Sequence, residues 1–300
     1  MSKVALIIIY NHQYNKNIEV LEKLYGHRFN NIFHLVPFYK GTKKNVISVY
    51  ENSYYFQGYV SQGLNSFFKE EYVHYFFIGD DLLLNPKINE NNYTEYLKLD
   101  EYTSFIPGFM SLHKLDFLWT YTKDALGYNL FIDGIEVKSM VPTYEQAILL
   151  FEKFNLEIGP LKFEQLFNKP ILKYNFKALK GFIGYHYKKS LNKKYDLSYP
   201  IVGSYSDIFV VSSNTIKDFC LYSGVFAATN MFVELAIPTA MVLSATKIVT
   251  EKDLDLQGKA LWSKEDYQIL DEYNYNLNTL QKDFPENHLY IHSIKLSKWK

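Results

Sequence analysis

The first 80 residues alternate between short apolar runs and segments of helical character. The apolar runs cover residues 4–10, 31–38, 46–50 and 72–79. Residues 15–28 carry apolar side chains every three or four positions, as amphipathic helices do, and residues 62–71 also look helical. Strands that alternate with helices predict a parallel sheet covered by helices. We therefore expect an α/β fold built on a Rossmann-like, mostly parallel sheet flanked by helices.

Beyond residue 85 the pattern is less regular, and the chain is polar as far as residue 103. The elements predicted there are an irregular strand over 104–112, a helix over 143–154, a strand over 203–212, a short helix over 215–223 and an apolar helix over 229–244. Gly224 should end the helix over 215–223, and Pro238 should kink the helix over 229–244 or mark a break in it. We expect residues 1–110 and 111–300 to be two functional halves packed as one continuous domain.

The fourth apolar run ends abruptly in Gly79-Asp80-Asp81. Adjacent carboxylates at the end of a buried strand are costly unless a cation neutralises them. In open α/β sheets, ligands bind beyond the carboxyl ends of the strands. Mg²⁺ and Mn²⁺ take carboxylate oxygens and leave positions for substrate phosphates. The pair therefore predicts a metal–diphosphate site, and the alternative is that it only caps the strand and opens a turn.

Composition narrows the class of protein. Hydrophobic residues make up 48% of the chain and charged residues 21%, as in ordinary folded proteins. The 32 basic and 32 acidic residues cancel, which argues against a general nucleic-acid binder. A lone cysteine, Cys220, excludes an intrachain disulfide framework and fits a reducing compartment. The N-terminal apolar run is too short for a signal peptide and no run is long enough to span a membrane, so we expect a cytoplasmic protein.

Residues 161–195 form a Lys-rich stretch that differs from the rest of the chain. It holds nine lysines against one acidic residue, Glu164, with Phe and Tyr interleaved. The lysines are residues 162, 169, 173, 177, 180, 188, 189, 193 and 194. Such a surface attracts anionic lipid headgroups or an anionic substrate. Peripheral contact with the inner face of the cell membrane is therefore one prediction, and an ordinary solvated helical face is the other.

Several of these features together resemble the GT-A class of nucleotide-sugar-dependent glycosyltransferases. The resemblance is carried by residues 4–10 with the polar loop behind them, by Phe76–Leu84 in place of the Asp-x-Asp motif, by the segment Asn230–Glu234, and by His292. It covers the first 110 residues as a pattern and the rest through scattered matches. Residue 79 is Gly, so the acidic motif departs from a strict Asp-x-Asp.

The resemblance implies a metal-dependent transfer from a UDP-sugar to a glycan or lipid-linked acceptor. Residues 1–110 would bind the nucleotide sugar, and residues 111–300 the acceptor. Asp81 would bind Mn²⁺ or Mg²⁺ with His292, while Asp80 would contact the ribose. The sequence leaves open which of the two aspartates binds the metal directly.

The remaining site residues are assigned by their chemistry. Tyr10, Asn11 and His12 follow the first strand and are candidates to stack on and hydrogen-bond the base. Glu51 follows the third strand and would meet the base or the ribose. If the enzyme inverts configuration, the acceptor hydroxyl needs a nearby carboxylate to take its proton. Glu234 is the first candidate for this base and Asp207 the second, although a lone acid on an apolar helix is commonly structural.

Two other classes of function remain open. A metal-dependent nucleotidyltransferase uses a similar sheet, but typically holds its triphosphate with a loop that contains Gly and Lys or Arg. The loop over residues 10–14 has none of these. A non-catalytic protein that binds glycans or nucleotides is the third reading, and the acidic residues Asp80, Asp81 and Glu234 argue mildly against it.

Overall fold

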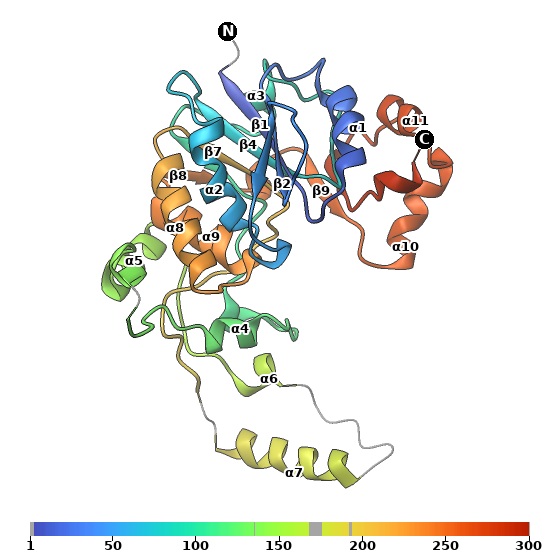
Figure 1. Cartoon of the computed structure of the whole chain (residues 1–300). Coiled ribbons are helices and arrows are strands. Elements are labelled where there is room, and N and C mark those ends of the chain that lie inside the picture. Colours follow the sequence, from blue (N-terminus) through green and yellow to red (C-terminus); the bar gives the residue numbers. More distant parts are fainter. Residues whose placement is uncertain (1–2, 135, 168–175, 192–193, 300) are drawn as a thin grey trace.

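The computed structural model describes residues 3–134, 136–167, 176–191 and 194–299 (Figure 1). Its main sheet has seven strands in the order β3-β2-β1-β4-β7-β6-β8. Their bounds are β1 Val4–Ile9, β2 Ile32–Pro37, β3 Val46–Val49, β4 His74–Gly79, β6 Thr103–Phe105, β7 Ile208–Ser212 and β8 Lys247–Val249. Strands β1 to β4 are parallel and β8 is parallel to β6, whereas β7 is antiparallel to both of its neighbours. The expected α/β fold with a mostly parallel sheet is confirmed.

A second, three-stranded sheet follows the order β5-β10-β9. Its strands are β5 (Leu82–Leu84), β9 (Gln257–Ala260) and β10 (His288–His292). Strand β10 runs antiparallel to β5 and parallel to β9. Because β5 begins three residues after β4 ends, this small sheet joins the C-terminal region to the acidic end of β4.

Helices cover both faces of the main sheet (Figure 1). The longer ones are α1 Asn15–Tyr25, α2 Gln57–Phe67, α5 Tyr144–Lys153, α7 Phe176–Ser190, α8 Ile216–Ala228 and α9 Val233–Ser244. The shorter ones are α3 Tyr93–Tyr96, α4 Thr122–Gly127, α6 Phe163–Leu166, α10 Lys264–Tyr267 and α11 Leu277–Lys282, with 3₁₀ turns that include η1 Ser53–Tyr55 and η4 Glu251–Asp253. Helices α2, α8 and α9 pack on one face, and α1 and the small sheet on the other.

Buried side chains on both faces explain why the strands are apolar throughout. In β1, Ala5 and Ile7 belong to the core beneath α2, α8 and α9, whereas Leu6 and Ile8 belong to the core beneath α1 and the small sheet. Strands β4 and β7 alternate in the same way. A strand with both faces covered has no polar side to show in its sequence.

The predicted end of a helix at Gly224 was wrong, and the helix that contains Pro238 does not break there. Helix α8 continues through Gly224 to Ala228. A Cβ at Gly224 would lie 2.5 Å from the Ser61 hydroxyl oxygen of α2, so this glycine allows two helices to approach rather than ending one. Helix α9 continues through Pro238. Proline has no N–H for the carbonyl four residues earlier, that of Glu234, and the Ser204 N–H donates to this carbonyl at 2.9 Å instead.

The Lys-rich stretch leaves the body and returns to it at one place. Leu161 and Tyr195 pair through two backbone hydrogen bonds of 2.8 and 3.1 Å, and Figure 1 shows α7 set apart from the sheets. Lys162, Lys180 and Lys194 are exposed, while the side chains of lysines 169, 173, 177, 188, 189 and 193 lie outside the described residues. Over the described ranges, no helix is long and apolar enough to cross a membrane.

Arg28, just after α1, fixes the position of the small sheet. Its guanidinium is buried and donates to the carbonyls of Asn85 at 2.6 Å and Ile88 at 2.6 and 2.8 Å. The Tyr25 hydroxyl donates to the Leu82 carbonyl at 3.2 Å and accepts from the Leu84 N–H at 3.1 Å. These bonds hold both ends of β5, and therefore the backbone that leaves Asp81.

We expect Arg28→Lys to destabilise the fold, because a single ammonium cannot reproduce the guanidinium's directed bonds to two carbonyls. Hydrogen bonds to charged groups are worth about 1.5–3 kcal/mol each, so a loss of roughly 2–3 kcal/mol in the free energy of unfolding is expected. Urea denaturation measures it. Lys23→Ala, an exposed change on the same helix, should shift stability far less; equal losses in the two variants would contradict the anchoring role.

Candidate metal centre and adjoining pockets

Strand pairing brings two residues that are far from Asp81 in the sequence to the carboxyl end of β4. Strand β7 pairs antiparallel with β4, and the Gly79 N–H donates to the Asp207 carbonyl at 2.8 Å, so β7 begins where β4 ends. In the small sheet His292 pairs with Leu82, the neighbour of Asp81. The Ile294 N–H then donates to the Asp81 carbonyl at 2.7 Å. Asp81, Asp207 and His292 meet for these reasons.

These three side chains form a group that could hold a metal ion, which we call the metal centre. Their ligand atoms all lie within 4.8 Å of one another. His292 Nε2 is 3.1 Å from Asp81 Oδ1 and 3.8 Å from Asp207 Oδ1. A Cβ at Gly79 would lie 3.3 and 3.5 Å from these same two oxygens. Glycine at this position keeps the carboxylates from being crowded.

The electrostatics of the metal centre favour a cation. Burial raises the pKa of Asp207, the Asp81 charge raises it further, and His292 opposes both. Burial by itself lowers the pKa of His292, but the hydrogen bond to Asp81 and the charge of Asp207 outweigh it, so the net shift is upward. In the described part of the chain, His292 is the sole ion-pair partner of these carboxylates. Two carboxylates and one imidazole suit a divalent cation with open coordination positions.

Asp80 points toward α1 rather than into the metal centre. It is almost fully buried and accepts from the Asn17 side-chain amide at 2.9 Å and the Asn11 N–H at 3.4 Å. Burial, together with the charge of Asp81, raises the pKa of Asp80 to about 7. Asn17 was not singled out from the sequence, because nothing in a helix-forming segment marks one amide as a partner of a distant acid.

A pocket of about 380 Å³, which we call the β1 pocket, opens beside Asp80 and Asp81. Its lining comprises Asn11, His12, Tyr14, Asn17, Asp80, Asp81, Ile294, Lys295, Leu296 and Ser297. Asn11, His12 and Asp80, predicted to contact the nucleotide, are brought together here. Lys295 is exposed and adds a positive charge that sequence analysis missed.

Two residues predicted to bind the nucleotide lie elsewhere. Tyr10 is fully buried, and its hydroxyl bonds to His34 Nδ1 at 2.9 Å, so its ring has no face for a base. Glu51 accepts from the backbone and side-chain N–H groups of Asn52 at 2.7 Å, and it packs beside Gly58 of α2. Neither residue lines the β1 pocket. Both residues follow strands in the sequence, but Tyr10 is turned into the core and Glu51 is turned toward Asn52 and α2.

A second pocket, of about 520 Å³, contains Glu234, and we call it the aromatic pocket. Its lining comprises Pro107, Met110, Phe117, Trp119, Tyr205, Glu234, Glu251, Gly258, Ala260, Trp262 and Tyr290. Burial, followed by the charge of Asp207, raises the pKa of Glu234 to about 7, and His292 partly opposes the shift. The described lining holds two carboxylates and no Lys or Arg.

Tyr205 connects the aromatic pocket to the metal centre. Its ring stacks parallel to Tyr290 at 5.8 Å and meets His292 edge-on at 5.5 Å. Its hydroxyl is buried and has no hydrogen-bond partner among the described residues. Buried hydroxyls are usually satisfied, so this one is positioned for water or a ligand.

Asp207 therefore lies in the metal centre and does not line the aromatic pocket, in contrast to Glu234. Its carboxylate faces Asp81 and His292, which favours a role as a metal ligand, and its role as a second base stays a prediction. Compared with known proteins, the sequence matches no family model and no curated protein.

The metal centre predicts saturable binding of Mn²⁺. Isothermal titration should show that Asp81→Ala, Asp207→Ala and His292→Ala each weaken binding at least tenfold, because two ligands hold a divalent ion poorly. Affinity should fall as the pH drops through the raised pKa of His292, since the proton competes with the ion.

Glu286→Ala is the matched control for the metal titration, because this carboxylate is 88% exposed and pairs with Lys87 rather than with any of the three ligands. It should bind Mn²⁺ as the unaltered protein does. Equal affinity in all four variants would rule out the metal centre.

Proposed function

We propose that this protein is a metal-dependent glycosyltransferase with GT-A-like architecture, which moves a sugar from a UDP-sugar to a hydroxyl of a glycan or lipid-linked acceptor. The observation that carries the proposal is the position of the metal centre between two pockets. One pocket lies beyond β1, where nucleotides bind in open α/β sheets. The other presents a half-buried carboxylate, Glu234, among aromatic rings.

The β1 pocket would hold the nucleotide. Asn11 and His12 offer hydrogen bonds to the base or ribose, and Lys295 offers a positive charge to the phosphates. Asp81, Asp207 and His292 would hold Mn²⁺ or Mg²⁺. An ion bound there neutralises the developing charge of a diphosphate leaving group.

Glu234 is suited to act as a general base. With a pKa of about 7, it is ionised over the upper half of the physiological range and can take the proton of an acceptor hydroxyl. In an inverting displacement the acceptor oxygen bonds to the anomeric carbon, the bond from that carbon to the diphosphate breaks, and the hydroxyl proton goes to Glu234. The bond from the Ser204 N–H to the Glu234 carbonyl ties this residue to the segment that carries Asp207 and leads into β7.

The first test is donor hydrolysis across UDP-, GDP- and CMP-sugars, with Mn²⁺ and with EDTA. We expect release of UDP that requires the metal and is lost in Asp81→Ala. Metal-dependent release of pyrophosphate from UTP and a sugar phosphate would instead identify a nucleotidyltransferase. Binding of UDP without any turnover would indicate a non-catalytic protein.

The second test concerns Glu234. For sugar transfer, kcat/KM should rise with pH through about 7 and then level off, because the base works only when ionised. Glu234→Gln should lower the rate by about 10²- to 10⁴-fold and remove this pH dependence, while UDP affinity is retained. Glu251→Gln changes the other carboxylate of the aromatic pocket and should keep the inflection. An unchanged profile in Glu234→Gln would remove this residue from the mechanism.

A further inference from the structure

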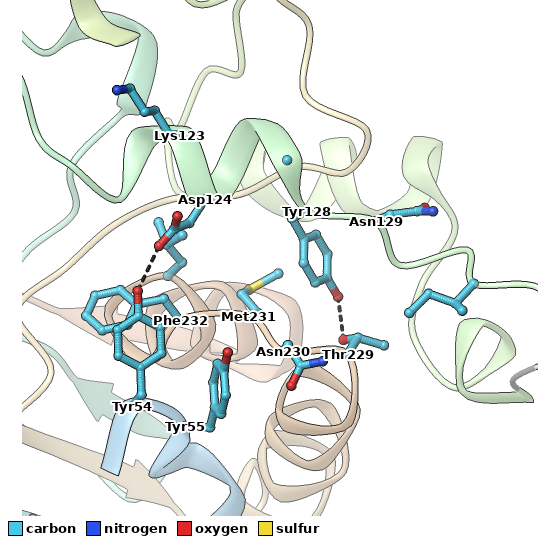
Figure 2. Close-up of a pocket in the computed structure, with 13 residues that line it drawn as sticks. Tyr54, Tyr55, Lys123, Asp124, Tyr128, Asn129, Thr229, Asn230, Met231 and Phe232 are labelled. Atoms are coloured by element: carbon cyan, nitrogen blue, oxygen red, sulfur yellow. Dashed lines mark hydrogen bonds between the residues drawn. The ribbon is translucent and has the colours of Figure 1, made fainter. Parts of the chain in front are cut away.

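A third pocket, of about 500 Å³, lies between α4, η1 and the turn that joins α8 to α9, and we call it the outer pocket (Figure 2). Its lining comprises Tyr54, Tyr55, Lys123, Asp124, Gly127, Tyr128, Asn129, Ile132, Thr229, Asn230, Met231, Phe232 and Leu235. Aromatic rings and small polar groups line it. Of its two charged residues, Asp124 faces the rings, whereas Lys123 points away from them and lies over the Phe167 ring at 5.3 Å (Figure 2).

The aromatic wall of the outer pocket is held in place by hydrogen bonds. The Tyr54 hydroxyl donates to Asp124 Oδ2 at 2.8 Å, and its ring lies 4.5 Å from that of Phe232 (Figure 2). The Tyr128 hydroxyl bonds to the Thr229 hydroxyl at 2.8 Å. Tyr54 remains 40% exposed, so a ring face is available at the mouth of the pocket. A rigid, partly open aromatic surface loses little conformational entropy when a ligand binds to it.

The first turn of α9 separates the outer pocket from the aromatic pocket. Phe232 and Leu235 line the outer pocket, and Glu234, between them in sequence, lines the aromatic pocket. The Trp119 ring of the aromatic pocket lies 5.4 Å from Tyr121, which stacks on Phe232 at 3.6 Å. A continuous row of rings therefore runs from beside Glu234 to Tyr54.

We propose that the outer pocket is a second sugar subsite, which binds the part of an oligosaccharide acceptor that lies away from the reacting hydroxyl. This inference rests on the proposed function. The C–H face of a pyranose packs on an aromatic ring, and its hydroxyls bond to carboxylate and amide groups such as Asp124, Asn129 and Asn230. A mixed aromatic and polar lining with one inward carboxylate, Asp124, suits a neutral glycan better than a phosphate or a purely apolar ligand.

The test uses a size ladder of neutral oligosaccharides, from disaccharides upward, with the UDP-sugar that the hydrolysis assay identifies. In the unaltered protein, KM should fall as the acceptor lengthens beyond two sugars. Tyr54→Ala should raise KM for the longer fractions at least tenfold, with little change in kcat, in donor hydrolysis or in KM for the shortest acceptors. Tyr54→Phe, which keeps the ring, should have a smaller effect.

Tyr102→Ala is the matched control, because this tyrosine is 54% exposed, precedes β6 and does not line the outer pocket. It should leave every KM unchanged. Equal effects of Tyr54→Ala on all acceptor lengths, or no dependence on length at all, would overturn the subsite. Metal-dependent donor hydrolysis without transfer to any fraction would also overturn it and leave the donor chemistry standing. Absence of donor hydrolysis would overturn the proposed function itself.

A separate observation concerns α7. Leu179, Ile183 and Tyr187 follow one another at four-residue spacing and so share one face of the helix. They are 45%, 61% and 65% exposed. Residues 165–195 contain eight lysines and no acidic residue, whereas the whole chain is neutral. The rest of the chain is therefore net acidic, and the positive charge is concentrated in residues 165–195.

We infer that α7 lies on an anionic lipid surface. An apolar stripe on a Lys-rich helix is the arrangement that binds membrane interfaces, and each Lys near an anionic surface adds to the attraction. Docking on a second copy of the chain is less well matched. The apolar groove between α1 and α11 is itself lined by Lys23 and Lys282, which repel a basic helix.

Co-sedimentation with phosphatidylcholine vesicles, with and without one quarter phosphatidylglycerol, tests this inference. The unaltered protein should sediment with the anionic vesicles only, and less at 0.5 M than at 0.1 M salt. Ile183→Glu should abolish the binding, whereas Leu149→Glu, at a 66% exposed leucine of α5, should not. No sedimentation, equal loss in the two variants, or a solution dimer that Ile183→Glu disrupts would overturn it.

Discussion

The cost of placing three carboxylates at one sheet edge is the constraint on which this structure depends. Asp80, Asp81 and Asp207 gather where β4 ends and β7 begins, and burial raises the pKa of Asp80 and Asp207. Within the described chain, one imidazole and two asparagine groups are the partners they find. Negative charge that protein groups only partly compensate favours a bound cation. The charge of Asp207 also adds to the effect of burial in raising the pKa of Glu234.

The backbone around this edge is arranged to hold that charge in place. Antiparallel β7 presents its first residues, not its last, to the end of β4, and so delivers Asp207. Pro238 leaves the Glu234 carbonyl free, and Ser204 takes it, which joins α9 to the segment leading into β7. Arg28 and Tyr25 hold β5, and β5 holds β10 with His292. Pro238 in α9 thus helps to position the segment that carries Asp207, and Arg28 after α1 helps to position His292.

The pockets follow from the same arrangement. The β1 pocket and the aromatic pocket lie on either side of the metal centre because one is built from the loop after β1 and the other from α9 and the small sheet. Aromatic side chains line both the second of these pockets and the outer pocket beyond it. Stacked rings keep their positions at low entropic cost, which suits a surface for a flexible glycan.

The sequence by itself determined the apolar strands, the helices between them and the acidic end of β4, because each is a local pattern with its own period or turn chemistry. It also singled out Glu234, as an acid on an apolar helix, and His292, as a match to the resemblance. Only the tertiary structure decided that Asp207 lies with Asp81 and His292, that Tyr10 and Glu51 turn away, and that Asn17 and Lys295 join the β1 pocket. Such contacts depend on strand order and register, which link residues up to 211 positions apart.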